Sequence, residues 1–202
     1  MMRTALAGLL VVAALMACSS ARGGAQLYEP LADSVRATLT SAVSDRAPPV
    51  FQFERAEDGH RWVFEMSKRL ARRMPDRARR IGFLKTVQYE ATRAGLDPQL
   101  VLGVIEVESA FRKYAVSSSG ARGYMQVMPF WTKLLKRPDD NLFHLRTNIR
   151  YGCVILRHYL DIERGDYFRA LGRYNGSLGQ RPYPDKVRRA WRDSWEYDGP
   201  RN

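Results

Sequence analysis

Apolar residues recur at intervals of three and four along most of the chain, from the Pro48-Pro49 break almost to the C-terminus. This spacing places them on one face of an α-helix, and no convincing run shows the two-residue alternation of a half-buried strand. The pattern therefore predicts a mainly helical fold. The expected helices are 60–73, 76–94, 98–112, 128–136, 147–164, 166–174 and 184–195, with a short one ahead of the break at Leu31, Val35, Leu39 and Val43.

The ends of the expected helices carry residues that suit them. Gly95 and Gly165 follow two of the segments, as left-handed glycines do at helix C-termini. Asp97 and Pro98 open another helix with a capping side chain and a first-turn proline. The segment from Val116 to Gln126 holds three serines and two glycines without helical periodicity, so it predicts a loop or small hairpin between helices.

Residues 1–17 have the layout of a secretory signal peptide, with Arg3 followed by an uncharged run whose apolar centre is Leu6 to Ala17. The run is short for a membrane span, which needs ~20 apolar residues. It ends Leu-Met-Ala-Cys-Ser, which resembles the lipobox of bacterial lipoproteins and implies a lipid anchor on Cys18. Ser19 fits sorting to the outer membrane, facing the periplasm. The alternative is an ordinary signal peptide and a soluble periplasmic or secreted protein.

The chain carries 33 Lys and Arg against 21 Asp and Glu, a formal net charge of +12. Nucleic acid, anionic lipid and anionic wall polymers all attract such a surface. The arginine-rich stretch 68–80 is explained by a solvated basic face over an apolar stripe, and a secreted chain rarely meets nucleic acid, so no nucleic-acid partner is expected. Two cysteines exclude a disulfide framework, and Cys153 lies on an apolar stripe as a buried residue.

One acid interrupts the apolar face of the helix expected at 98–112. Val101, Val104, Ile105 and Phe111 share that face with Glu108. Loss of hydration raises the pKa of a carboxyl group and suits it to general acid catalysis. A buried glutamate paired with an arginine would have the opposite shift, and the stripe alone leaves the two alternatives open.

The residues after Glu108 carry a recognisable pattern. Glu108-Ser109-Ala110-Phe111 leads into Ser117-x-x-Gly-Ala-x-Gly-Tyr-Met-Gln-x-Met-Pro129, followed by Asn148-Ile-x-x-Gly152 and Tyr174-Asn-Gly. These three ordered motifs resemble the soluble lytic transglycosylase family, glycoside hydrolase family 23, over roughly residues 80–195. Tyr124 departs from the family pattern, which has Leu there.

The resemblance implies a lysozyme-like helical domain with a small loop or hairpin at the active-site cleft. Members of the family cleave the β-1,4 bond between N-acetylmuramic acid and N-acetylglucosamine in peptidoglycan, without metal or other cofactor. By motif position Glu108 is the acid and then the base, and the product is a 1,6-anhydro end. The positions implied to bind substrate are Ser117, Gln126, Met128, Tyr174 and Asn175, with Tyr124 in the groove lining.

The expected organisation is a signal peptide (1–17), a lipidated cysteine, tether and extension (18–55), an accessory helical segment (56–79) and a catalytic domain (80–197). Peptidoglycan strands and the membrane are the expected partners; the oligomeric state stays open, and a monomer is expected. One alternative is a goose-type muramidase that uses water with a second acid, Asp139 or Asp140. Another is a non-catalytic wall-binding protein.

Overall fold

The structure, a computed structural model, describes residues 26–199, so the predicted signal peptide and Cys18 lie outside the described residues. Within this range the chain is helical and forms no strand, which confirms the predicted fold class. The elements are α1 Asp33–Val43, α2 Ala56–Leu70, α3 Arg77–Arg93, α4 Pro98–Ser109, α5 Phe130–Leu134, α6 Leu145–Ile162, α7 Tyr167–Asn175, α8 Pro182–Ala190 and the π-helical turn η1 Trp191–Trp195. None of these helices is both long and apolar enough to cross a membrane.

The helix ends follow from local chemistry. The carboxylate of Asp97 accepts a hydrogen bond from the backbone N–H of Gln99 at 2.7 Å, and Pro98 occupies the first turn of α4. Gly95 and Gly165 have φ of 66° and 87°, the left-handed conformation predicted for them. These boundaries are therefore encoded by short-range residue choices.

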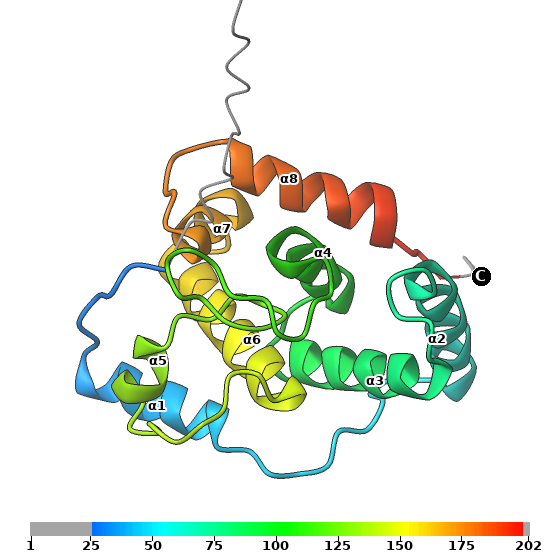
Figure 1. The fold of residues 1–202 in the computed structure, drawn as a ribbon, viewed down its shortest axis with the longest axis horizontal. Helices are drawn as coiled ribbons and strands as arrows, with labels where there is room; N and C mark the ends of the chain where they lie inside the picture. Colours follow the sequence, from blue (N-terminus) through cyan, green and yellow to red (C-terminus); the bar gives the residue numbers. More distant parts are fainter. Residues whose placement is uncertain (1–25, 200–202) are drawn as a thin grey trace, which may run out of the picture.

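Helix α4 lies at the centre of the molecule, where it packs on α3, α8 and η1 (Figure 1). Its residues Leu100, Val101, Leu102, Val104 and Ile105 are all fully buried. Each such side chain contributes about 1.5–3 kcal/mol by leaving water. The helix that carries Glu108 is thus enclosed over most of its length.

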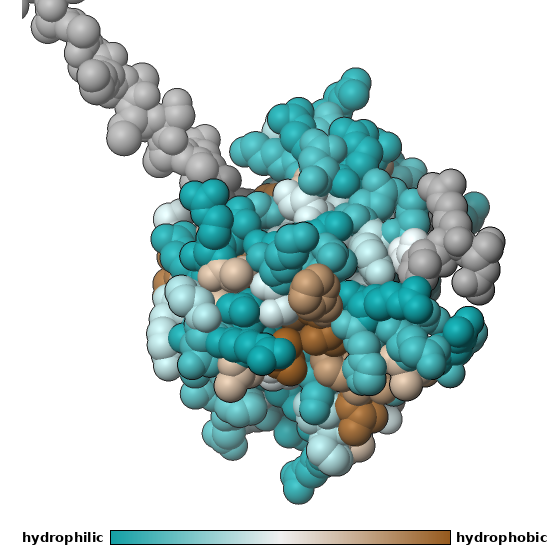
Figure 2. Space-filling view, turned by 90° about the vertical axis from the view of Figure 1, so that its right-hand side faces the viewer, coloured by the Kyte–Doolittle hydropathy of each residue, from teal (hydrophilic) through white to brown (hydrophobic). Residues whose placement is uncertain are grey.

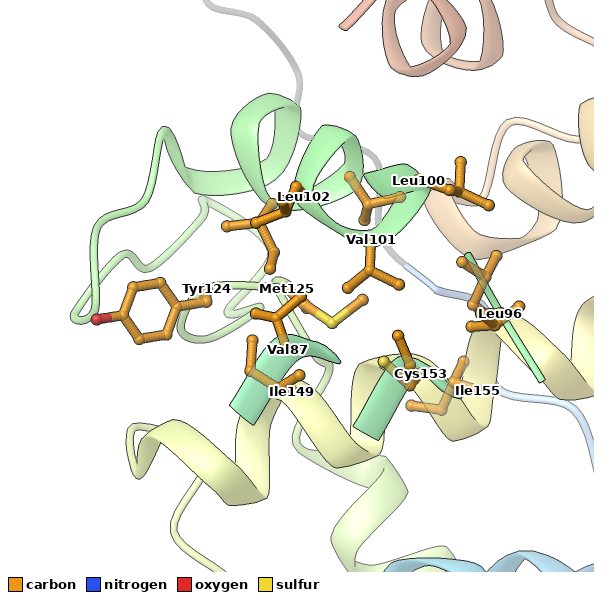
Figure 3. Packing of buried hydrophobic residues seen from close by; sticks show 14 of the residues in the cluster. Val87, Leu96, Leu100, Val101, Leu102, Tyr124, Met125, Ile149, Cys153 and Ile155 are labelled. Carbon is orange, nitrogen blue, oxygen red and sulfur yellow. The ribbon is translucent and has the colours of Figure 1, made fainter. Parts of the chain in front are cut away.

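The hydrophobic core is one cluster that extends from α1 to η1. In Figure 3, Met125 reaches from the 115–127 loop into this cluster, among Val87 of α3, Val101 of α4 and Ile149 of α6. Cys153 is fully buried there, as predicted. Trp62 of α2 joins the same cluster, so the segment ahead of the family-like region is packed against it.

Helix α4 ends at Ser109 rather than at residue 112, which corrects the predicted boundary. Ala110 and Phe111 follow with φ of 48° and 65°. Left-handed conformation is costly for residues with a Cβ and ends the helix at once. Phe111 is nonetheless 5% exposed, because its ring packs on Phe83 and Trp195 instead of continuing the helical stripe.

The predicted basic face is present with one exception. Arg72, Arg77 and Arg79 are exposed, whereas Arg80 is buried. The guanidinium of Arg80 donates to the Ser67 hydroxyl at 2.8 Å and to the carbonyl oxygen of Met74 at 2.6 Å. Arg80 therefore ties α3 to α2 instead of facing solvent.

A hydrophobic patch interrupts the mostly hydrophilic face that carries α2 (Figure 2). It surrounds a hollow of about 1100 Å³ between α2, α3 and the segment before α2. The apolar residues lining the hollow are Phe51, Phe53, Val63, Phe64 and Ile81.

Candidate functional site

Glu108 lies in the last turn of α4, the central helix of the fold. Its side chain is partly exposed, and its Oε1 accepts a hydrogen bond of 2.6 Å from the Tyr183 hydroxyl. Tyr183 stands in the first turn of α8 and is 8% exposed. The α4–α8 contact thus places a neutral donor against the carboxyl group.

Burial raises the pKa of Glu108 to about 8, although the Tyr183 hydrogen bond lowers it. Water is the main stabiliser of a carboxylate, so its removal favours the neutral acid. The C-terminal end of α4 has the same effect, because the helix dipole is negative there. Glu108 is therefore protonated at neutral pH and able to donate a proton.

The neighbouring acid behaves differently. Glu106 binds the guanidinium of Arg73, and its Oε2 accepts a hydrogen bond from the Trp195 indole at 2.6 Å. It therefore faces η1 and the turn that follows α2, away from Tyr183, as its position two residues from Glu108 predicts. The alternative of an arginine partner applies to Glu106 and not to Glu108.

The loop from Ala115 to Val127 is a compact turn structure closed by two isolated antiparallel bridges, Val116 to Arg122 and Arg122 to Val127. Gly120 and Gly123 have φ of 84° and 75°, so both sit at sharp turns as predicted. A Cβ on Gly123 would come within 2.7 Å of the Leu142 carbonyl oxygen. The predicted small hairpin is thus a bridged loop.

Two of the predicted substrate-binding residues help to shape this loop. The Ser117 hydroxyl accepts a hydrogen bond from the Ala121 N–H at 3.1 Å and remains partly exposed. The Gln126 amide donates to the carbonyl oxygens of Ala115 and Gly123 at 3.1 and 2.9 Å, and its side chain is largely buried. Gln126 has a φ of 48°, a strained value for a non-glycine residue.

The second motif, on α6, holds the backbone of the loop in place. Asn148 accepts a hydrogen bond from the Met125 N–H at 2.8 Å and donates to the carbonyl oxygens of Arg122 and Leu142, each at 2.8 Å. A Cβ on Gly152 would lie 2.7 Å from the Cβ of Met125. Asn148 and Gly152 therefore position the loop rather than face a ligand.

The third motif holds the opposite side of the loop. The Tyr174 hydroxyl donates to the Met125 carbonyl oxygen at 2.7 Å and is fully buried. Burial is the main reason that the pKa of Tyr174 lies well above its ordinary value, and the charge of Glu108 raises it further. Tyr174 is thus close to Glu108, whereas Asn175 accepts a hydrogen bond from the Ser177 hydroxyl at 3.1 Å.

Tyr124 gives most of its side chain to the core. It is 2% exposed, and its ring centroid lies 5.0 Å from that of Phe83. Figure 3 shows the ring at the edge of the cluster with the hydroxyl directed outward. Little of the residue besides that hydroxyl is available to a ligand, and its place in the groove lining stays a prediction.

Asp140 belongs to a different network. Burial by itself would raise the pKa of Asp140, but hydrogen bonds from Arg137 and Tyr151 hold it below its ordinary value. These bonds measure 2.6 and 2.8 Å, and Arg137 also reaches the Ser44 hydroxyl after α1. Within residues 26–199, no group of three or more His, Cys, Asp or Glu side chains is arranged to hold a metal ion.

The sequence did not single out two residues of this region. Tyr183 lies 75 positions from Glu108 and resembles any other core aromatic. Gln26 lies 100 positions from Gln126, yet its Nε2 donates to the Gln126 carbonyl oxygen at 3.2 Å. Neither stands in a motif, so only the fold reveals their contacts.

Comparisons with known proteins agree with the motifs. Membrane-bound lytic murein transglycosylase C from Actinobacillus pleuropneumoniae serotype 5b (strain L20) is 42% identical over 129 residues, 59% of this chain and 34% of that protein. The protein of the same name from Haemophilus influenzae (strain PittEE) is 37% identical over 147 residues, 63% of this chain and 40% of that protein. The transglycosylase of Enterobacteria phage PRD1 is 36% identical over 110 residues, 51% of this chain and 40% of that protein.

A solved structure, that of an inactive mutant of lytic transglycosylase Slt from Pseudomonas aeruginosa, matches with a TM-score of 0.43 and 22% identity, over 81% of this chain and 27% of that one. The chain spans between about a third and two fifths of the length of the curated relatives above. A family model described as the transglycosylase SLT domain matches residues 85–191, more than half of the chain. The chain therefore belongs to the transglycosylase SLT domain family, as its three motifs predict.

Proposed function

We propose that this chain is a lytic transglycosylase that cleaves the β-1,4 bond between N-acetylmuramic acid and N-acetylglucosamine in peptidoglycan strands. The observation that carries the proposal is the setting of Glu108 at the end of α4, where the neutral hydroxyl of Tyr183 donates to its carboxyl group at 2.6 Å and burial raises its pKa to about 8. Family membership and the names of the relatives support the substrate class.

In the proposed reaction, the Glu108 carboxyl group protonates the glycosidic oxygen, and the bond from that oxygen to the anomeric carbon breaks. The acetamido oxygen of the muramoyl residue stabilises the positive carbon. The Glu108 carboxylate then takes the proton of the muramoyl 6-hydroxyl, whose oxygen bonds to the anomeric carbon and closes the 1,6-anhydro ring. The proton returns to Glu108, so the cycle needs neither water nor a second carboxylate.

The placement of the acidic residues around the loop supports a mechanism with a single carboxyl group. The segment from Lys113 to Pro129 contains no Asp or Glu. Asp140, one of the two residues that could be the second acid of a water-using muramidase, is bound by Arg137 and Tyr151. A carboxylate held in this way is a structural partner rather than a base available to water.

The deciding experiment combines Glu108→Gln with mass spectrometry of the muropeptides released from purified peptidoglycan. The wild type should release 1,6-anhydro ends, which are one water lighter than reducing ends, and Glu108→Gln should release almost none while still binding the polymer. Asp140→Asn is the second arm and should still yield anhydro ends. Reducing ends as the only product would establish a muramidase, and an absence of cleavage by the wild type would favour a wall-binding protein.

We propose the same substrate-binding set that the motifs imply: Ser117, Gln126, Met128, Tyr174 and Asn175, with Tyr124 at the margin. Residues 80–197 would form the catalytic domain and 56–79 an accessory segment packed on it. The shared core between α2 and the remaining helices supports a fixed relation between the two.

Attachment to the outer membrane through Cys18 is also part of the proposal, with residues 1–17 as the signal peptide and 18–55 as anchor, tether and extension. Relatives named membrane-bound support it. Cys18→Ser should abolish labelling by a lipid precursor and move the protein to the soluble fraction. Unchanged membrane association would show that Cys18 does not anchor the protein and that another segment does.

A further inference from the structure

The first described residue of the chain inserts its side chain into the candidate site. Gln26 is 4% exposed, although Leu27 and Tyr28 directly after it are 61% and 62% exposed. Its Nε2 donates to the Gln126 carbonyl oxygen at 3.2 Å, and its Oε1 accepts from the Met128 N–H at 2.9 Å. A polar side chain is thus buried by pairing with the backbone of two predicted substrate-binding residues.

The backbone that Gln26 covers is an unpaired edge of the loop. Val127 exchanges both of its backbone hydrogen bonds with Arg122, each at 3.0 Å, which leaves the flanking groups of Gln126 and Met128 on the other side. Neither the Gln126 carbonyl nor the Met128 N–H has a second hydrogen-bond partner among the described residues. This edge offers one acceptor and one donor to a ligand.

Gln26 and Glu108 share Tyr174 as a neighbour. A hydrogen bond with Gln26 lowers the pKa of the Tyr174 hydroxyl, and the charge of Glu108 raises it, so both groups act on the same hydroxyl. Two contacts hold the segment that follows. Glu29 pairs with Arg173 at 3.1 Å, and the Tyr28 ring meets that of Phe130 edge-on at 5.7 Å.

A carboxamide and an acetamido group offer the same two functions, an N–H donor and a carbonyl acceptor. Both sugars of the proposed substrate carry an acetamido group. We propose, on the basis of the proposed function, that residues 26–29 are a self-occluding segment: Gln26 occupies the acetamido-binding edge at Gln126 and Met128, and it must withdraw before a glycan strand can bind.

Self-occlusion makes a specific prediction about affinity. For a ligand that binds only the open form, the apparent dissociation constant equals the intrinsic constant divided by the open fraction. Gln26→Ala in the Glu108→Gln background should therefore bind a chitin oligosaccharide about tenfold more tightly than the Glu108→Gln parent, by calorimetry. A fully de-N-acetylated chitosan oligosaccharide of the same length should show no gain. In the active background, KM should fall with kcat nearly unchanged.

Two further variants make the test decisive. Leu27→Ala, on an exposed neighbour, should leave the affinity unchanged, and Glu29→Gln, which loosens the segment without removing the amide, should give a smaller gain than Gln26→Ala. Unchanged or weaker binding by Gln26→Ala, or an equal gain for the de-N-acetylated ligand, would overturn the inference and make Gln26 a structural brace. If the parent and Gln26→Ala both fail to bind any N-acetylated glycan, the proposed function fails as well.

Discussion

Glu90 and Glu108 differ in the kind of group that contacts their carboxyl groups. The Glu90 side chain is fully buried and binds the guanidinium groups of Arg93, Arg146 and Arg150. Glu108 meets only the phenol of Tyr183 among the hydrogen-bond donors described. Arginine favours the charged carboxylate, whereas burial beside a neutral hydroxyl favours the acid. The partner, and not burial alone, therefore separates a structural glutamate from a proton donor.

The raised pKa of Glu108 has a cost in stability that depends on pH. Below pH 4.5 the group is neutral in both states, but between 4.5 and about 8 only the unfolded chain releases its proton, so stability falls as pH rises through this window. Glu108→Gln removes the titration and keeps the Tyr183 hydrogen bond. We expect it to be about 1–3 kcal/mol more stable than the wild type at pH 7, and equal to it at pH 4, in urea unfolding.

Glu196→Gln, on an exposed residue, is the control and should show no such difference between the two pH values. If Glu108→Gln has the same stability relative to the wild type at pH 4 and pH 7, the carboxyl group titrates normally and the proposed acid role loses its basis.

The Tyr183 hydroxyl stabilises the ionised form of Glu108. Tyr183→Phe removes that hydrogen bond and should move the alkaline limb of the pH–activity profile upward by about one unit, since a hydrogen bond to a charged group contributes roughly 1.5 kcal/mol or more. Tyr167→Phe is the control, on a partly buried tyrosine whose ring lies tilted against that of Trp191 with the centroids 6.0 Å apart. A loss of activity without a shifted limb would show that Tyr183 only supports the fold.

Sequence reasoning reached Glu108 because helical spacing and a local motif both mark it. It could not reach Tyr183 or Gln26, because their contacts cross 75 and 100 residues and depend on the α4–α8 packing and on the path of the N-terminal segment. Such contacts leave no periodicity or spacing in the chain. The burial of the Tyr124 ring against Phe83 was likewise not evident from its motif position.

At the level of elements, the second and third motifs hold the bridged loop, which belongs to the first motif, in place. Asn148 of α6 binds the backbone on one side of Met125, and Tyr174 of α7 binds its carbonyl oxygen on the other. The Met125 side chain fills the space above Gly152. Two motifs thus act through the loop, which carries Ser117 and Gln126.

Gly152 should therefore tolerate no side chain. Gly152→Ala brings a Cβ to 2.7 Å from the Cβ of Met125 in the packed core and should lower the free energy of unfolding by about 1–3 kcal/mol. Gly82→Ala is the matched control, since a Cβ on this helical glycine of α3 meets nothing within 4 Å and should be stabilising by up to ~1 kcal/mol. Equal effects in thermal unfolding of the two variants would contradict this packing argument.

The helices themselves were largely predictable, because periodicity, capping aspartates and terminal glycines act over a few residues. The end of α4 was not. Ala110 and Phe111 take left-handed conformations that their residue types disfavour. The packing of the Phe111 ring on Phe83 and Trp195 accounts for the conformation of Phe111. Long-range burial outweighed local preference at the point where the chain leaves Glu108.

On the scale of the whole molecule, charge ties the N-terminal part to the family domain. Asp45, just after α1, and Glu90 of α3 share the guanidinium groups of Arg93, Arg146 and Arg150. Arg150 also donates to the Val43 carbonyl oxygen at 3.1 Å. Leu39 and Val43 join the common core. The segment ahead of the matched family region is thus part of the same packed unit.

If α1 belongs to that unit, loss of Glu90 should destabilise the whole chain at once. Glu90→Gln removes the fully buried one of the two carboxylates that Arg93, Arg146 and Arg150 share, and should lower the free energy of unfolding by about 3–5 kcal/mol, with helical circular dichroism and tryptophan fluorescence still changing in one coincident transition. Asp161→Asn, which breaks the exposed pair with Arg157, should cost less than ~1 kcal/mol. One transition is expected because the charge network joins the end of α1 to α3 and α6, so that its loss releases all three together. A separate early transition would instead make the N-terminal part an independent module.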